Sequence, residues 1–203
     1  MKASEKRRIA RAIRSAVPGL YEKRGLLAAT PRGRILRGIA LEGSAADPDG
    51  VYLWMFVQPL YVPATTVVLT IGGRLGGGFK TWHADEAEAA AAVAQEKGVP
   101  FFGPIISPAK FADWEYLDGK RNGYIREAKA YSLIAAGRLV EGIRALRELA
   151  ESLAGKDTPW VVEIKERAEQ LAALAESNPP GAHELLAQWE AETVAELRIQ
   201  DVP

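Results

Sequence analysis

Cysteine is absent from this chain of 203 residues, and histidine occurs only twice. The lack of thiols excludes a disulfide framework, a zinc site built on thiolates and a cysteine nucleophile. Long apolar runs are also lacking: the longest, VYLWMFV at residues 51–57, is far shorter than the roughly 20 residues that cross a bilayer. The charged first residues are not followed by the apolar stretch of a signal peptide. We therefore expect a soluble, cytoplasmic protein with no membrane partner.

The formal net charge is zero, but the two signs are unevenly distributed along the chain. Residues 1–37 carry eleven Lys or Arg against two Glu, a balance of +9, which leaves fifteen basic and twenty-four acidic residues, or −9, for the rest. Such asymmetry indicates either an end that faces a polyanion or two ends that attract each other.

Residues 4–17, SEKRRIARAIRSAV, have the period of an amphipathic helix, with Ser4 as N-cap and Ile9 and Ile13 on one face. Pro18-Gly19 ends this helix. Its basic side chains are the candidate contacts for a polyanion such as nucleic acid, or for acidic helices of the same chain or of a second copy. These candidates are Lys6, Arg7, Arg8, Arg11 and Arg14.

Strand-like runs follow and are separated by turn-rich segments. They cover residues 25–30, 34–42, 51–58 and 65–72. No helical pattern lies between them, so we expect an antiparallel meander of three or four strands rather than βαβ units. In the third run Tyr52, Trp54 and Phe56 point one way. This aromatic stripe belongs either to a central strand covered on both faces or to a surface on which nucleic-acid bases stack.

From residue 84 onward, apolar residues recur with the spacing of a helix. Helical segments are expected at residues 84–97, 109–117, 123–154, 160–177 and 182–198. The fold class is therefore α+β: an N-terminal helix plus an antiparallel meander in residues 1–83, followed by an all-helical C-terminal half in residues 84–203. The helical half is expected to dock on the sheet, so that the two parts form either two domains or a single one.

The spacing of small and large residues near position 137 resembles a tetratricopeptide hairpin. The residues that carry the resemblance are Ala130, Leu133, Gly137, Gly142 and Leu146. It covers about residues 126–154, a single unit, whereas a stack of such hairpins needs about three repeats to be stable. The resemblance implies a style of packing, in which a helical hairpin lies against a neighbouring helix, and it does not assign a family.

A glycine-rich stretch, TIGGRLGGGFKTW at residues 70–82, stands between an apolar run and a helical one. A phosphate-binding P-loop needs lysine directly after its last glycine, but here Phe79 separates Gly78 from Lys80. We therefore expect a glycine-rich turn or bulge rather than a nucleotide loop. An alternative is a contact loop for a partner or ligand. Its candidate residues are Arg74, Lys80, Trp82 and His83.

Catalytic and metal-binding patterns are weak throughout. His83 with Asp85 and Glu86 has the composition of a helix start, where acidic residues are favoured, more than that of a metal site. Asp113, Glu115 and Asp118 form a local acidic group typical of a solvated helix face. No serine stands in a G-x-S-x-G motif. We assign no catalytic residue, no metal and no cofactor.

Three functional hypotheses remain open. The first is a non-enzymatic protein-interaction module, such as an adaptor, immunity-type or accessory protein of a bacterial system, whose partner is another protein or a copy of itself. The second is a nucleic-acid-associated protein that binds phosphates through the basic N-terminal helix. The third is an enzyme with an unrecognised site near the glycine loop.

Overall fold

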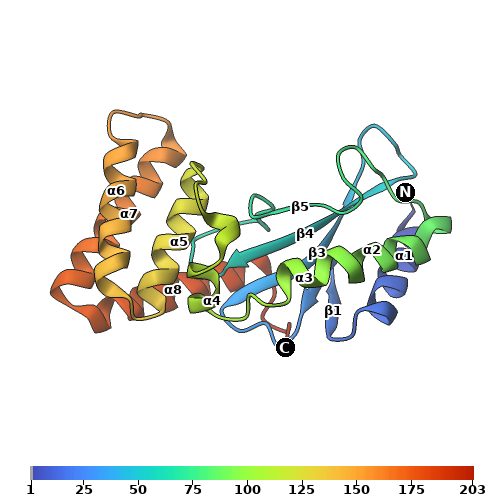
Figure 1. Cartoon of the computed structure of the whole chain (residues 1–203), viewed down its shortest axis with the longest axis horizontal. Coiled ribbons are helices and arrows are strands. Elements are labelled where there is room, and N and C mark those ends of the chain that lie inside the picture. The colour runs from blue at the N-terminus through green and yellow to red at the C-terminus, as the bar shows by residue number, and fades with distance from the viewer. Residues whose placement is uncertain (1) are drawn as a thin grey trace. The chain divides into compact units, whose positions relative to one another are not determined.

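The computed structural model describes residues 2–203 (Figure 1). The chain divides into two compact units. A sheet unit is formed by residues 1–58, 67–106 and 198–203, and a helical unit by residues 59–66 and 107–197. The expected boundary at residue 83 differs from this division, because residues 84–106 and the last six residues belong with the sheet.

The sheet unit contains a five-stranded antiparallel meander, which confirms the expected α+β class. Neighbours in the sheet are neighbours in the sequence, in the order β1-β2-β3-β4-β5. The strands are β1 (Leu20–Lys23), β2 (Leu26–Ala29), β3 (Ile35–Gly43), β4 (Val51–Pro59) and β5 (Gly72–Arg74). The long apolar runs that form β3 and β4 supply most of the sheet's buried side chains.

Two strands differ from expectation. β1 is additional, and it pairs with β2 through a two-residue turn in which Arg24 and Gly25 both have positive φ, the geometry that suits a tight hairpin. The expected strand at residues 65–72 is wrong, since β5 begins only at Gly72. The backbone N–H of Val68 instead donates to the side-chain oxygen of Gln58, at 2.9 Å, so a side chain takes the place of a ladder bond.

Short helices cover one face of the sheet (Figure 1). Ile9 and Ile13 of the first helix are fully buried, and Gly98 lies against Ile39 of β3 and Leu75, which follows β5. The helical segments are α1 (Ala3–Ala16), the 3-10 turn η1 (Ala84–Glu86), α2 (Ala87–Val93), the π-type turn η2 (Ala94–Gly98) and α3 (Val99–Phe102).

The last six residues return to the sheet unit. Ile199 and Val202 are buried, and Lys23 of β1 pairs with Asp201. The backbone N–H of Arg32 donates to the carbonyl of Pro203, at 2.7 Å.

The helical unit consists of two short and four long segments. Proline stands at the first turn of α4, α7 and α8, where its missing N–H costs nothing. Among residues 2–203, no helix combines the length and apolar character that a membrane crossing requires. The segments are α4 (Pro108–Ala112), the 3-10 turn η3 (Glu115–Leu117), α5 (Gly123–Ala135), α6 (Leu139–Leu153), α7 (Pro159–Ser177) and α8 (Pro179–Leu197).

α5 and α6 form a helical hairpin that turns at Gly137, whose φ is +80°. A Cβ added to Gly142 would meet the side chain of Ile134 at 2.5 Å, so the two helices approach closely at this glycine. These two glycines are among the residues on which the tetratricopeptide resemblance rests. Gly137 permits the turn and Gly142 permits the close approach of the two helices, so local geometry is enough to explain the hairpin.

A buried carboxyl group lies in the core of the helical unit. Glu127 of α5 is 0% exposed, and the Nε of Arg167 on α7 donates to its Oε1 at 3.0 Å. The hydroxyls of Tyr124 and Tyr131, which lie one turn away on α5, are also buried. Burial raises the pKa of Glu127 above its ordinary value, and Arg167 opposes that shift. The carboxyl group therefore depends on one guanidinium for its charge.

The raised pKa of Glu127 predicts a pH-dependent stability. The group contributes full stability below its unfolded pKa of about 4.3, and that contribution is lost as the pH rises through the higher folded value. We therefore expect the free energy of unfolding of wild type to fall relative to that of Glu127→Gln as the pH rises from about 4. Denaturant titrations at several pH values measure this difference. The exposed control Glu184→Gln should parallel wild type, and a parallel Glu127→Gln curve would contradict the prediction.

Candidate functional site

Two adjoining hollows in the helical unit form one groove between the α4–η3 segment, α5 and α6. Their volumes are ≈ 550 and ≈ 340 Å³. They share a set of lining residues, which makes them continuous: Asp118, Lys129, Leu133, Ala145 and Glu148. We call this feature the charged groove, because nine of its lining residues carry charge. They are Asp113, Asp118, Lys120, Arg126, Lys129, Arg138, Glu141, Arg144 and Glu148.

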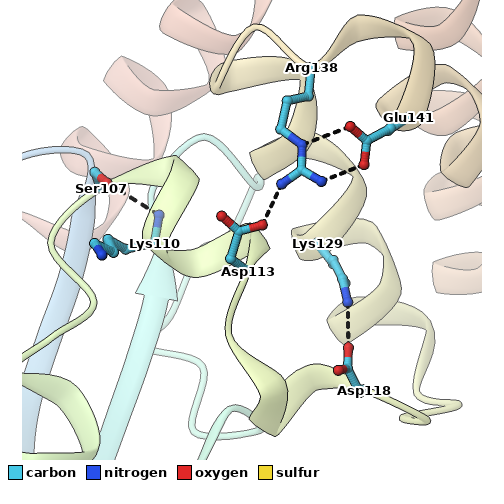
Figure 2. Close-up of polar contacts among 7 residues, drawn as sticks. All are labelled: Ser107, Lys110, Asp113, Asp118, Lys129, Arg138 and Glu141. Carbon is cyan, nitrogen blue, oxygen red and sulfur yellow. Dashed lines mark hydrogen bonds and ion pairs between the residues drawn. The ribbon is translucent and has the colours of Figure 1, made fainter.

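Arg138 fixes one end of the charged groove. It follows Gly137 at the turn of the α5–α6 hairpin, and its guanidinium lies between Asp113 and Glu141 (Figure 2). Its Nε donates to Oε1 of Glu141 at 2.9 Å. These hydrogen bonds lower the pKa of Glu141 and raise that of Arg138. All three groups therefore stay charged near neutral pH, and they hold the end of α4 against the hairpin.

Lys129 fixes the middle of the charged groove. Its Nζ lies 2.6 Å from Oδ1 of Asp118, which follows η3 (Figure 2). The α4 helix itself is capped by Ser107, whose hydroxyl accepts from the backbone N–H of Lys110 at 3.3 Å (Figure 2). Asp113 and Asp118, expected as part of a solvated acidic face, are exposed, and they also pair with Arg138 at the start of α6 and with Lys129 of α5.

Several charged side chains of the groove have no oppositely charged partner in the described part of the chain. Lys120 lies over the ring of Tyr116, with Nζ 4.7 Å from the ring centre. Arg126 donates to the hydroxyl of Ser152 at 2.5 Å and to the carbonyl of Glu148 at 3.1 Å. Arg144 is exposed and forms no ion pair within residues 2–203, although it lies close enough to Glu141 to contribute to lowering the pKa of that carboxyl group. Over all nine charged residues, five cations face four carboxylates, because Arg138 is shared by Asp113 and Glu141, so the groove has a net charge of +1.

The four residues expected at the glycine loop have separate partners in the sheet unit. Arg74 lies with its guanidinium carbon 3.8 Å from the ring centre of Tyr52 and 4.7 Å from that of Trp54. Its Nη1 donates to the carbonyl of Gly78 at 3.1 Å. Trp82 is 4% exposed and donates to the carbonyl of Leu75, so it belongs to the core of the unit.

Lys80 and His83 each have an acidic partner in their own unit. Lys80 Nζ lies 2.5 Å from Oε1 of Glu86, and His83 Nε2 lies 3.1 Å from Oδ2 of Asp47. Thr81 donates to the same Asp47 oxygen at 2.7 Å, and this bond, with a smaller contribution from His83, lowers the pKa of Asp47. Because the carboxylate stands between hydroxyl and imidazole, the arrangement is not a nucleophile–base pair.

Gly76, Gly77 and Gly78 all have positive φ, which side-chain-bearing residues rarely adopt. The glycine run is thus explained by a tight turn. The next residue, Phe79, is 92% exposed. Within residues 2–203 no group of three or more His, Cys, Asp or Glu is arranged to hold a metal ion.

The basic residues of α1 separate into two sets. Arg7, Arg8, Arg11 and Arg14 are exposed. Lys6 is half-buried, and its Nζ would lie 3.6 Å from a Cβ added to Gly43. The structure therefore places Lys6 on the packed side of α1, unlike the four arginines.

Comparison with protein-family models, with curated proteins and with solved structures finds no match for this chain.

Proposed function

We propose that the protein is a non-enzymatic protein-interaction module whose helical unit binds an acidic segment of a partner protein in the charged groove. The observation that carries this proposal is a set of three cations without an ion-pair partner, Lys120, Arg126 and Arg144, in a groove whose net charge is +1. Complementary charge of this kind accelerates encounter and selects partners.

Preorganisation supports the same function. The ion pairs of Arg138 and Lys129 hold α4 and η3 in place before any partner arrives. Arg126 is likewise fixed by Ser152 and by a backbone carbonyl. A groove whose walls are already ordered loses less conformational entropy on binding than a flexible one. Leu133 and Ala145 add a small apolar floor on which an aliphatic side chain of the partner can pack.

Reversal of one groove charge tests the proposal. Arg144 is exposed and forms no ion pair, so Arg144→Glu should leave the fold intact while weakening an acidic ligand about tenfold, or about 1.4 kcal/mol. The probe is a fluorescein-labelled peptide of alternating Glu and Leu, measured by anisotropy. The matched control is Lys156→Glu, the same charge change at an exposed position of the same unit outside the groove.

Wild type and Lys156→Glu are expected to bind the Glu–Leu peptide equally, and neither should bind a Lys–Leu peptide of the same length. Equal binding of both peptides, or an unchanged affinity in Arg144→Glu, would overturn the proposal. Self-association that is lost in Arg144→Glu would assign the acidic segment to a second copy of the chain.

A further inference from the structure

One side of α1 is a continuous surface of arginine. The helix buries Ile9, Ala10 and Ile13 against its own unit. On the opposite side, every exposed residue from position 4 to position 15 is arginine or serine. Arg7, Arg11 and Arg14 follow the i, i+4, i+7 spacing of one helix face and span about 10 Å along the axis, with Arg8 beside them. We call these four residues the arginine face.

The arginine face is only slightly neutralised by its own unit. Arg14 has the one acidic partner, Glu22, at 3.4 Å, and it also donates to the carbonyl of Leu20. Arg7 donates to the carbonyl of Ala3 at 3.3 Å, which leaves its charge unpaired. Arg8 and Arg11 make no hydrogen bond or ion pair within residues 2–203. Three guanidinium groups on one rigid face therefore lack a counter-charge.

The composition of this face favours a nucleic acid over a protein. Protein interfaces are organised around a buried apolar or aromatic centre, and the exposed side of α1 between Ser4 and Ser15 has no such residue. Phosphate oxygens, in contrast, accept the paired N–H groups of arginine and need no apolar contact. A nucleic-acid strand supplies a regular row of such phosphates.

We propose that the arginine face of α1 binds the phosphodiester backbone of a nucleic acid without reading its sequence. Arg7, Arg8 and Arg11 supply the contacts, because Arg14 is already engaged by Glu22. This inference is independent of the charged groove, which lies in the other unit of the chain. It predicts an affinity that falls steeply with salt, since each neutralised phosphate releases bound counterions.

The test is fluorescence anisotropy of the full chain with a labelled duplex DNA and a duplex RNA of the same sequence, each titrated over a range of salt. The variant is Arg7→Ala/Arg8→Ala/Arg11→Ala. Alanine favours the helix, so the fold should persist, and circular dichroism checks this. The control removes three exposed, unpaired cations of the helical unit: Lys110→Ala/Arg121→Ala/Lys156→Ala.

Wild type and the control are expected to bind, with log K falling linearly with log salt. The arginine-face variant should bind both duplexes more weakly, and its slope should be smaller by about 0.9 for each lost contact, or roughly 3 in total. Binding to DNA alone or to RNA alone identifies the natural duplex and supports the proposal. Absence of binding by wild type at low salt, an unchanged slope in the variant, or an equal loss in the control would overturn it.

Discussion

Gly38→Ala is expected to lower the free energy of unfolding by about 4 kcal/mol or more, one of the two largest effects predicted for this chain. Gly38 lies in β3 opposite Ala28 of β2, with φ at +149°. A Cβ at this position would lie 2.0 Å from the carbonyl oxygen of Leu27 and 3.2 Å from the Cα of Ala28. Both are backbone atoms of a paired strand, so relief requires the two strands to separate.

The matched control for Gly38→Ala is Gly77→Ala. Gly77 also has positive φ, at +80°, but a Cβ there meets nothing within 4 Å. This variant isolates the cost of backbone conformation, roughly 1–2 kcal/mol. Denaturant unfolding followed by circular dichroism compares the two, and equal losses would show that β2 and β3 are not held at the described distance.

Arg167→Met is expected to cost about 3–5 kcal/mol at neutral pH, because it leaves the carboxylate of Glu127 buried without its counter-charge. Methionine keeps an unbranched side chain, so that the loss reports mainly the charge. The double variant Glu127→Gln/Arg167→Met should recover most of that stability, since it removes both members of the pair together.

The surface pair of Arg147 and Glu176 serves as the comparison for the buried pair. Its side chains are 62% and 39% exposed, so Arg147→Met should cost no more than about 1 kcal/mol. Thermal or denaturant unfolding of the three variants compares the cost of breaking the buried pair with that of breaking the surface pair. A loss in Arg167→Met as small as that in Arg147→Met would mean that Glu127 is uncharged in the folded protein.

Sequence patterns predicted the helices and strands well where apolar residues follow a single period, that of a helix or that of a strand. The runs that became β3 and β4 were identified nearly to the residue, as was the turn at Gly137 between α5 and α6. The run at residues 65–72 was wrongly predicted as a strand because it has the composition of one. In the structure its Val68 donates to the side chain of Gln58, ten residues earlier, and composition does not reveal such a partner.

Side-chain partners could not be predicted, because they join distant parts of the sequence. Asp47 lies 34 residues before Thr81, and Asp113 lies 25 residues before Arg138. A signal for the buried Glu127 was present nonetheless. Glu127 lies between Tyr124 and Tyr131 at helical spacing, so its carboxyl group interrupts an otherwise apolar face. A buried carboxylate needs a cation, which here comes from a neighbouring helix.

The return of residues 198–203 to the sheet unit has a consequence for proteolysis. The helical unit needs only residues 59–66 and 107–197, where Tyr61 is already buried and bonded to Ser132. Ile199 and Val202, which are buried in the sheet unit, follow the helical unit in the sequence. The helical unit therefore interrupts the sheet unit, and a single cut anywhere in the chain cannot release both units whole.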